Sequence, residues 1–343
     1  GLVGSEMCIR DRYCCEIDLL LDIWGLYMGD SKVKNENMIL DFTHVYRDED
    51  IKDIDRFRYI DCSDIQETDM YCSKNAYEKI WGRIEPYGIQ GIHYIDSGNY
   101  HYITKIITDH ITEPFGLVMY DHHTDMQIPM VPEMMSCGDW AGQTLIQNEN
   151  LRQLVVVGPP ESDIEQTLES YKGSKGRQEN VESYKCGYNV QEAEYDDSYD
   201  ISRDISSERL LIFSAKDLHG GLPEDKLKHI RTDLPLYISI DKDVLGTEYT
   251  ETNWSQGDMS IDGLERLLSV FLGGQGEEKN TDACRNDERY AGGIRHSRIL
   301  GVDVCGEVQT DISVPEYLEA EEKNEKVNIE LFRFISEHVK KFR

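Results

Sequence analysis

The sequence predicts an α/β protein with a mostly parallel central sheet and helices on both faces. Short apolar runs alternate along the chain with helix-like segments, an order typical of parallel α/β folds. The runs are continuously apolar and do not alternate with polar residues, which indicates strands covered on both faces.

The elements follow from this pattern in chain order. Strands are predicted at Asn37–Phe42, Gly88–Ile95, Phe115–Tyr120, Leu154–Gly158, Leu210–Phe213, Leu236–Ile240 and Ile299–Val304. Helices are predicted at Ser73–Arg83, Tyr102–His110, Glu224–His229, Ile261–Leu272 and Asn328–Val339.

The predicted domain is residues 13–343, taken as one unit. Residues 2–12 (LVGSEMCIRDR) back-translate in one frame into a transposon-based sequencing adapter, so we interpret residues 1–12 as an artefact and exclude them. Residues 161–204 are polar and acidic and are predicted to form an insertion that begins with a helix capped by Ser162 and continues as an exposed loop.

Composition narrows the class of protein. A formal net charge of -30 repels phosphate backbones, so nucleic acid is excluded as a partner. No apolar run of 18 residues occurs, and no membrane association is predicted. The cysteines form no CxxC pair, a pattern typical of free thiols in a reducing compartment, so a cytoplasmic protein is predicted.

The strongest chemical signal follows the strand Phe115–Tyr120. The segment DHHTD begins directly after it, so that Asp121, His123 and Asp125 share one face of an extended chain. In open α/β sheets, ligands bind beyond the carboxyl ends of strands. Taken alone, the segment could equally be a polar turn with an incidental histidine.

Two further strands end in the same kind of residue. Leu236–Ile240 leads into Asp241 and Asp243, and the turn GNYH presents His101 after another strand. Carboxylates buried together repel one another unless a cation lies between them. Four carboxylates and two imidazoles suit a pair of Mn²⁺ ions better than one Zn²⁺, which usually takes three protein ligands at a catalytic site.

These motifs resemble the ureohydrolase family, which includes arginase, agmatinase and formimidoylglutamase. The family pattern is a glycine-rich turn ending in His, then D-A-H-x-D, then S-x-D-x-D, and here GNYH, DHHTD and SIDKD stand in that order within Gly88–Glu307. The resemblance implies a three-layer α/β/α sandwich and a dinuclear Mn²⁺ centre held by the six ligands. It also implies metal-hydroxide attack on a small guanidino or amidino substrate, and homotrimers or homohexamers.

The resemblance also implies catalytic roles for two residues. Asp125 would help to orient the hydroxide, and Glu307 would grip the guanidinium, although it stands one residue late and Gly306 occupies the matching position. Trp140 falls near the place of arginase's proton-shuttling histidine, and Gln127 replaces an asparagine that reads the substrate carboxylate. The metal ligands therefore match the family, whereas the residues that contact substrate differ.

Two other interpretations stay open. A deacetylase of the same architecture would use a single zinc and would not need His101 or the pair Asp241 and Asp243. A metal-binding family member that has lost activity could serve as a sensor or assembly subunit. Metal content and turnover distinguish these from a hydrolase of C–N bonds.

Overall fold

The structure is a computed structural model that describes residues 35–47, 50–53, 56–131, 133–173, 201–219, 222–273, 298–308 and 313–342. Residues 1–12, which we interpret as an artefact, lie outside the described residues, and so does most of the predicted insertion 161–204.

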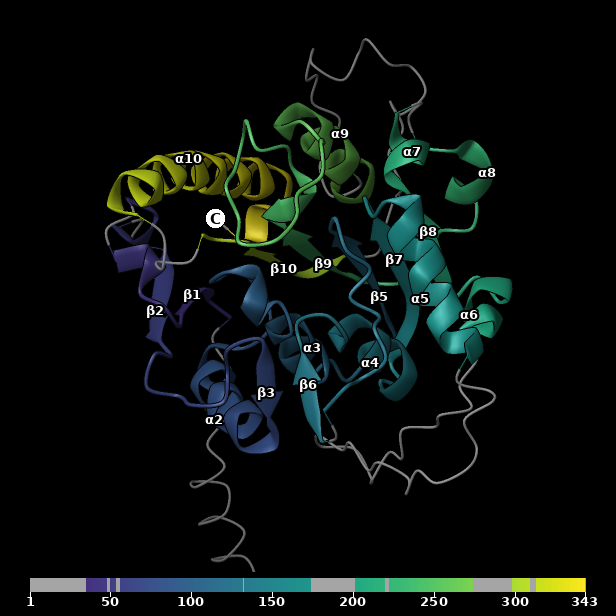
Figure 1. Ribbon diagram of the computed structural model, residues 1–343, viewed down its shortest axis with the longest axis horizontal. Coiled ribbons are helices and arrows are strands. Elements are labelled where there is room, and N and C mark those ends of the chain that lie inside the picture. Colours follow the sequence, from purple (N-terminus) through teal and green to yellow (C-terminus); the bar gives the residue numbers. More distant parts are fainter. Residues whose placement is uncertain are drawn as a thin grey trace, which may run out of the picture. The chain divides into compact units, whose positions relative to one another are not determined.

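An eight-stranded sheet, parallel throughout, forms the centre of the described chain (Figure 1). Its strand order is β2-β1-β4-β10-β9-β5-β7-β8. In that order the strands are Phe57–Asp61, Asn37–Asp41, Ile92–Ile95, Ile299–Cys305, Leu236–Asp241, Phe115–Tyr120, Leu151–Val157 and Leu210–Phe213. All seven strands predicted from the sequence are present, with ends that differ by up to four residues.

Helices cover both faces of this sheet, which confirms the predicted α/β/α sandwich (Figure 1). One face carries α2 (Lys74–Ile84), α3 (Ile103–Thr108), α4 (Trp140–Gln147) and α5 (Glu161–Gly173). The opposite face carries α7 (Ala215–Leu218), α8 (Glu224–Leu227), α9 (Ile261–Leu272) and α10 (Val314–His338).

Alternating side chains of the strands build two separate cores. Leu117 and Met119 of β5 pack in the core beneath α2, α3 and α4, whereas Val118 and Tyr120 pack in the core beneath α9 and α10. Because successive strand residues point to opposite faces, a strand buried on both sides needs an unbroken apolar run. The sheet is thereby held rigidly between two layers, and its carboxyl edge is fixed in place.

Several elements differ from the sequence-based expectation. The segment 161–204 begins as α5 at Glu161 and ends in α6 (Ser202–Ser206), so Ser162 lies inside the helix and is not its cap. The C-terminal helix α10 starts at Val314, fourteen residues earlier than predicted, where Ser313 and Glu316 form a capping box. A small antiparallel pair, β3 (Tyr71–Ser73) with β6 (Met134–Ser136), was not predicted.

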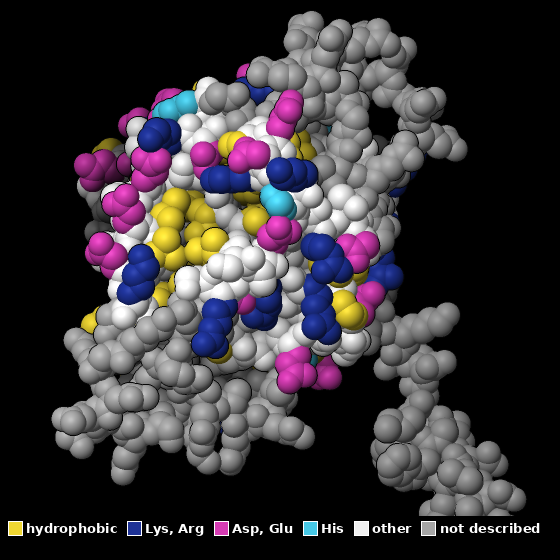
Figure 2. Space-filling view, turned by 90° about the vertical axis from the view of Figure 1, so that its right-hand side faces the viewer, with side chains coloured by type: hydrophobic (Ala, Val, Ile, Leu, Met, Phe, Trp, Pro, Cys, Tyr) yellow, Lys and Arg dark blue, Asp and Glu magenta, His cyan; other side chains and the backbone are white. Residues whose placement is uncertain are grey.

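Two further observations concern the surface and the helices of the described residues. Figure 2 shows acidic and basic side chains intermixed around an apolar area on one face. Among the described residues, no helix combines the length and the apolar character that crossing a membrane requires.

Candidate metal centre

Three strands at the middle of the sheet, β4, β9 and β5, lead into the six candidate ligands, and β10 lies between β4 and β9. The order β4-β10-β9-β5 places the carboxyl ends of these strands side by side. His101 follows β4 through the turn η4 (Gly98–Tyr100), and Asp241 ends β9, whereas Asp121 follows β5 directly. The carboxyl edge of a parallel sheet is where such folds bind ligands, and this edge gathers all six predicted metal ligands.

The segment after β5 reaches the centre by turning. The backbone amide of His123 donates to Asp121 Oδ1 at 2.6 Å, and that of His122 donates to Asp243 Oδ1 at 2.9 Å. Asp125 has a φ of 48°, in the left-handed region, which Asp residues tolerate better than most. The three side chains therefore converge as the sequence predicts, through a left-handed turn where an extended chain was expected.

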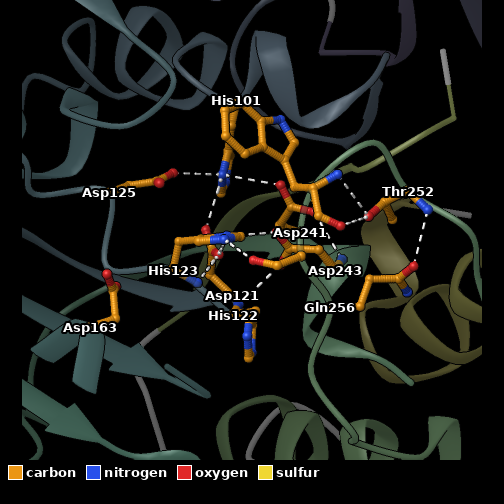
Figure 3. A network of polar contacts seen from close by, with 12 residues as sticks. His101, Asp121, His122, His123, Asp125, Asp163, Asp241, Asp243, Thr252 and Gln256 are labelled. Atoms are coloured by element: carbon orange, nitrogen blue, oxygen red, sulfur yellow. Dashed lines mark hydrogen bonds and ion pairs between the residues drawn. The ribbon is translucent and has the colours of Figure 1, made fainter. Parts of the chain in front are cut away.

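The first group of ligand atoms surrounds His101. Its Nδ1 lies 3.2 Å from Asp121 Oδ2 and 3.0 Å from Asp125 Oδ2, and Asp241 Oδ2 is 3.5 Å away (Figure 3). All four side chains are buried, with at most a tenth of their surface exposed.

The second group lies around His123, which comes from the same turn. His123 Nδ1 is 2.8 Å from Asp243 Oδ2 and 3.5 Å from Asp121 Oδ1. Asp121 thus presents one oxygen to each imidazole. It belongs to two of the three candidate metal groups among the described residues, one with His101 and Asp125 and one with His123 and Asp243. A shared carboxylate between two ligand groups fits two adjacent cations.

In both His101 and His123, Nε2 makes a hydrogen bond on the side away from the carboxylates, so that Nδ1 is free to bind a cation. His101 Nε2 lies 2.9 Å from Ser239 Oγ, and Ser239 donates in turn to Asp303 Oδ1 at 2.6 Å. Because Ser239 gives its proton to Asp303, it accepts one from His101 Nε2. His123 Nε2 has an equivalent partner in Ser255 Oγ at 2.8 Å. Metal-binding histidines are typically held in this way, with the other ring nitrogen fixed by a hydrogen bond.

The electrostatics of the cluster favour a cation. Burial, and then the charge of Asp121, raise the pKa of Asp125 to about 7. Burial and the neighbouring Asp241 raise the pKa of Asp243 well above its usual range. Burial would lower the pKa of His123, but hydrogen bonds to Asp121 and Asp243 outweigh it and raise the pKa to about 12. Each shift reflects carboxylates that need compensating positive charge.

Two buried atoms at the centre have no hydrogen-bond partner among the residues that the structure describes. They are His101 Nδ1 and Asp121 Oδ2, which face one another at the meeting point of the first group. Buried polar atoms are nearly always satisfied, so a pair of unsatisfied ligand atoms in a carboxylate cluster fits a cation. The oxygen and nitrogen donors suit Mn²⁺ and related divalent ions.

A pocket opens above the cluster. Asp121, His123, Asp125, Asp241 and Asp243 form its floor, and its walls include Met70, Tyr71, Gln127, Cys137, Asp163 and Trp254. In Figure 3 Asp163 lies apart from the cluster, with no contact drawn to the residues around His101. The walls mix apolar, amide and carboxylate groups, which suits a small polar molecule.

Trp140 supports the floor of the pocket. Its indole Nε1 donates to Asp125 Oδ2 at 2.6 Å, and its ring packs at 4.7 Å from the ring of His101. Near the place that the resemblance assigns to a proton-shuttling histidine, the chain therefore carries a buried indole that holds a candidate ligand in place.

Glu307 lies away from the pocket lining. Its carboxylate accepts hydrogen bonds from the buried Lys242 ammonium and, at 2.8 Å, from Asn328 of α10. A Cβ on Gly306, the position where the family carries its glutamate, would lie 2.6 Å from Asp241 Oδ1, and Gly306 has a φ of 97°. This backbone therefore excludes a glutamate at 306, and the catalytic role of Glu307 stays a prediction that these contacts do not support.

Sequence reasoning missed the residues around the six ligands. They are Ser239, Ser255, Asp303 and Cys305. Cys305 is the last residue of β10 and pairs in register with Asp241 of β9. Cys305 therefore lies at the carboxyl end of a strand, where ligands are expected, but the predicted strand ends at Val304 and does not include it. Nothing in the sequence marks Ser255.

The hydrogen bond from Ser239 can be tested directly. Replacing Ser239 with Ala removes the acceptor of His101 Nε2, so the imidazole loses its fixed orientation. We expect about 10–100-fold weaker Mn²⁺ binding, the usual effect of losing such a partner, measured by equilibrium dialysis. Ser136→Ala, which alters a serine of the pocket lining without a bond to either imidazole, is the control, and equal losses in both variants would contradict the assignment.

Fold and site together define a three-layer α/β/α protein with clustered metal-ligand side chains at the carboxyl edge of its sheet. No family model matches the sequence. An uncharacterized protein of Thermotoga maritima is 26% identical over 246 residues, which cover 70% of this chain and 66% of that protein, just under two thirds of its length.

Solved structures of similar fold include an arginase from Bacillus subtilis (TM-score 0.47, 12% identity, 88% of this chain and 98% of that chain). Others are an agmatine ureohydrolase of Thermoplasma volcanium (0.47, 11%, 90% and 92%) and a formimidoylglutamase of Bacillus subtilis (0.46, 11%, 86% and 85%). Likenesses of this size do not assign a family.

Proposed function

We propose that this protein is a dinuclear Mn²⁺ hydrolase of the ureohydrolase type, which cleaves a C–N bond in a small guanidino or amidino compound. In the proposal it is a cytoplasmic homo-oligomer. The observation that carries the proposal is the position of Asp121, whose two oxygens face two different imidazoles and which belongs to two ligand groups.

The proposed ligands divide into two sets. His101 and Asp125 would hold one ion and His123 and Asp243 the other, with Asp121 shared and Asp241 beside the first. When bound, a pair of such ions lowers the pKa of water, so that hydroxide is available at neutral pH.

The protein's own groups would position the reactants. Asp125 is held by the indole of Trp140 and faces the pocket, where it can orient the attacking water. Asp163 presents a pocket-lining carboxylate that would favour a cationic substrate, although one of its oxygens also accepts from the backbone amide of Thr124 at 2.8 Å. The buried cluster keeps the ligands oriented before substrate arrives.

A second candidate function is supported by one observation. Because Glu307 is bound to Lys242 and Asn328, the group that would grip a guanidinium is engaged elsewhere. A metal-binding protein without turnover, such as a sensor or assembly subunit, would show this arrangement. A single-zinc deacetylase is less well supported, because it leaves the second group of ligands unused.

The experiment that separates these functions is an assay of Mn²⁺-reconstituted protein with arginine, agmatine, other guanidino acids and formimidoylglutamate. Release of urea or formamide from one of them, abolished by a chelator and restored by Mn²⁺, is the expected result. Two bound ions without turnover of any substrate would favour the inactive protein. One Zn²⁺ per chain with deacetylation of an acetylated amine would favour the deacetylase.

A further inference from the structure

Cys305 lies against the proposed metal ligands, and the six-ligand assignment gives it no role. Its Sγ donates to Asp241 Oδ2 across 3.2 Å. The sulfur, one nitrogen of His101 and one oxygen of Asp241 lie within 4.8 Å of one another, and all three residues are buried. This spacing is the one expected of side chains that can meet at a single ion.

The placement of Cys305 is a consequence of the sheet. β10 lies between β4 and β9, and the pairing of Cys305 with Asp241 brings its side chain to the same edge as the other ligands. Gly306 has a left-handed φ of 97°, and its backbone amide donates to the carbonyl of Asp96, which fixes the backbone directly after Cys305. The side chain is thus fixed by strand register, with little freedom to turn elsewhere.

The neighbour of Cys305 also indicates a ligand. Among the described residues, Nδ1 of His101 is buried without a hydrogen-bond partner, and it lies 3.5 Å from Oδ2 of Asp241. His101 and Asp241 both belong to the group that contains the sulfur. A cation bound there would displace the thiol proton to solvent and take the sulfur as thiolate. A buried thiol with no such role would need only an apolar neighbourhood, whereas this one contacts a carboxylate.

We propose that Cys305 is a seventh metal ligand, which supplies a thiolate to the ion held by His101 and Asp241 and makes that position prefer softer cations such as Zn²⁺ or Co²⁺ over Mn²⁺. Thiolate selects such ions, whereas carboxylate and imidazole alone tolerate Mn²⁺. The two positions then differ in preference, because the group of His123, Asp121 and Asp243 contains no sulfur. This inference rests on the proposed dinuclear centre.

The test is absorption spectroscopy of the full-length protein loaded with Co²⁺. Bound Co²⁺ gives visible ligand-field bands whatever its donors, whereas a near-ultraviolet sulfur-to-metal band needs a thiolate. We expect both in the wild type and loss of only the near-ultraviolet band in Cys305→Ser. The matched control is Cys137→Ser, since Cys137 lines the same pocket but belongs to none of the ligand groups found among the described residues, and it should keep both bands.

The same variants give a second measurement that does not depend on cobalt. In competition between Zn²⁺ and Mn²⁺, Cys305→Ser should shift the preference towards Mn²⁺ by tenfold or more, since even outer partners of a ligand change affinity by about 10–100-fold. If Cys305→Ser is poorly folded, X-ray absorption of the Zn²⁺-loaded wild type replaces it, with a sulfur neighbour expected at about 2.3 Å.

The outcomes separate the two proposals. Visible bands with an unchanged near-ultraviolet spectrum in Cys305→Ser would overturn the thiolate ligand and leave the dinuclear centre standing. Absence of all cobalt bands in the wild type would overturn both. Loss of the near-ultraviolet band in Cys137→Ser and its retention in Cys305→Ser would show that Cys137 supplies the thiolate, and would overturn the inference.

Discussion

Asp121→Ala is expected to lose both bound Mn²⁺ ions and nearly all hydrolytic activity. Asp121 belongs to both ligand groups, so its removal takes one oxygen from each. Metal ions contribute several kcal/mol to hydrolytic transition states, so the loss of kcat/KM should be roughly 1,000-fold or more. Metal content is measured on dialysed protein by elemental analysis, and activity with the substrate that the assay identifies.

A graded series sharpens this result. Asp121→Asn has a side chain of similar shape and keeps one of the two oxygens, so it should retain part of the metal. Asp163→Asn removes the charge of a pocket-lining carboxylate that belongs to neither group of Asp121, and this variant should bind two ions. Undiminished binding of two ions by Asp121→Ala would show that the shared carboxylate has been misassigned.

Lys242→Met is expected to lower the free energy of unfolding by about 3–5 kcal/mol, the cost of leaving a buried carboxylate without its partner. Lys242 lies between Asp241 and Asp243 but points to the opposite face of the sheet, where its ammonium contacts Glu307 and Asn328. Both members of the ion pair are essentially inaccessible to solvent. Urea unfolding of the metal-free protein measures the change without a contribution from bound ions.

The double variant Lys242→Met with Glu307→Gln is the control. Removing both charges avoids an unpaired buried ion, so it should recover most of the lost stability. A double variant as unstable as Lys242→Met would mean that packing, and not charge, holds this region. Glu307→Gln alone should keep its metal; a large loss of kcat in that folded, metal-loaded variant would return Glu307 to the catalytic role that the resemblance implies.

Much of the fold follows from the sequence because the central strands are buried on both faces. β5 and β8 have the predicted bounds, and α9 also does, since Ser260 caps it and an apolar face follows. β2 was not predicted because it is an edge strand, in which Arg58 and Tyr59 are exposed. Charged side chains commonly protect the edge of a sheet. The sequence of β2 therefore lacks the apolar run by which the others were found.

The site was predictable in part for a related reason. Candidate ligands that come shortly after an apolar strand stand out in the sequence. The structure places the side chains of six such residues close together: His101, Asp121, His123, Asp125, Asp241 and Asp243. Side chains that reach the candidate ligands only because distant segments pack together do not stand out in the sequence. Ser255 and Trp140 are such residues, and so is the pairing of Glu307 with Lys242, which requires the position of α10.

The central claim, that two ions share Asp121, is tested most directly by the binding stoichiometry of the wild-type protein. Metal-free protein is dialysed against increasing Mn²⁺ as the sole divalent metal, and bound metal is counted per chain. Saturation at two ions per chain, reduced in Asp121→Ala, is the predicted result. Saturation at one ion, or no binding above that of Asp121→Ala, would contradict a dinuclear centre at this edge of the sheet.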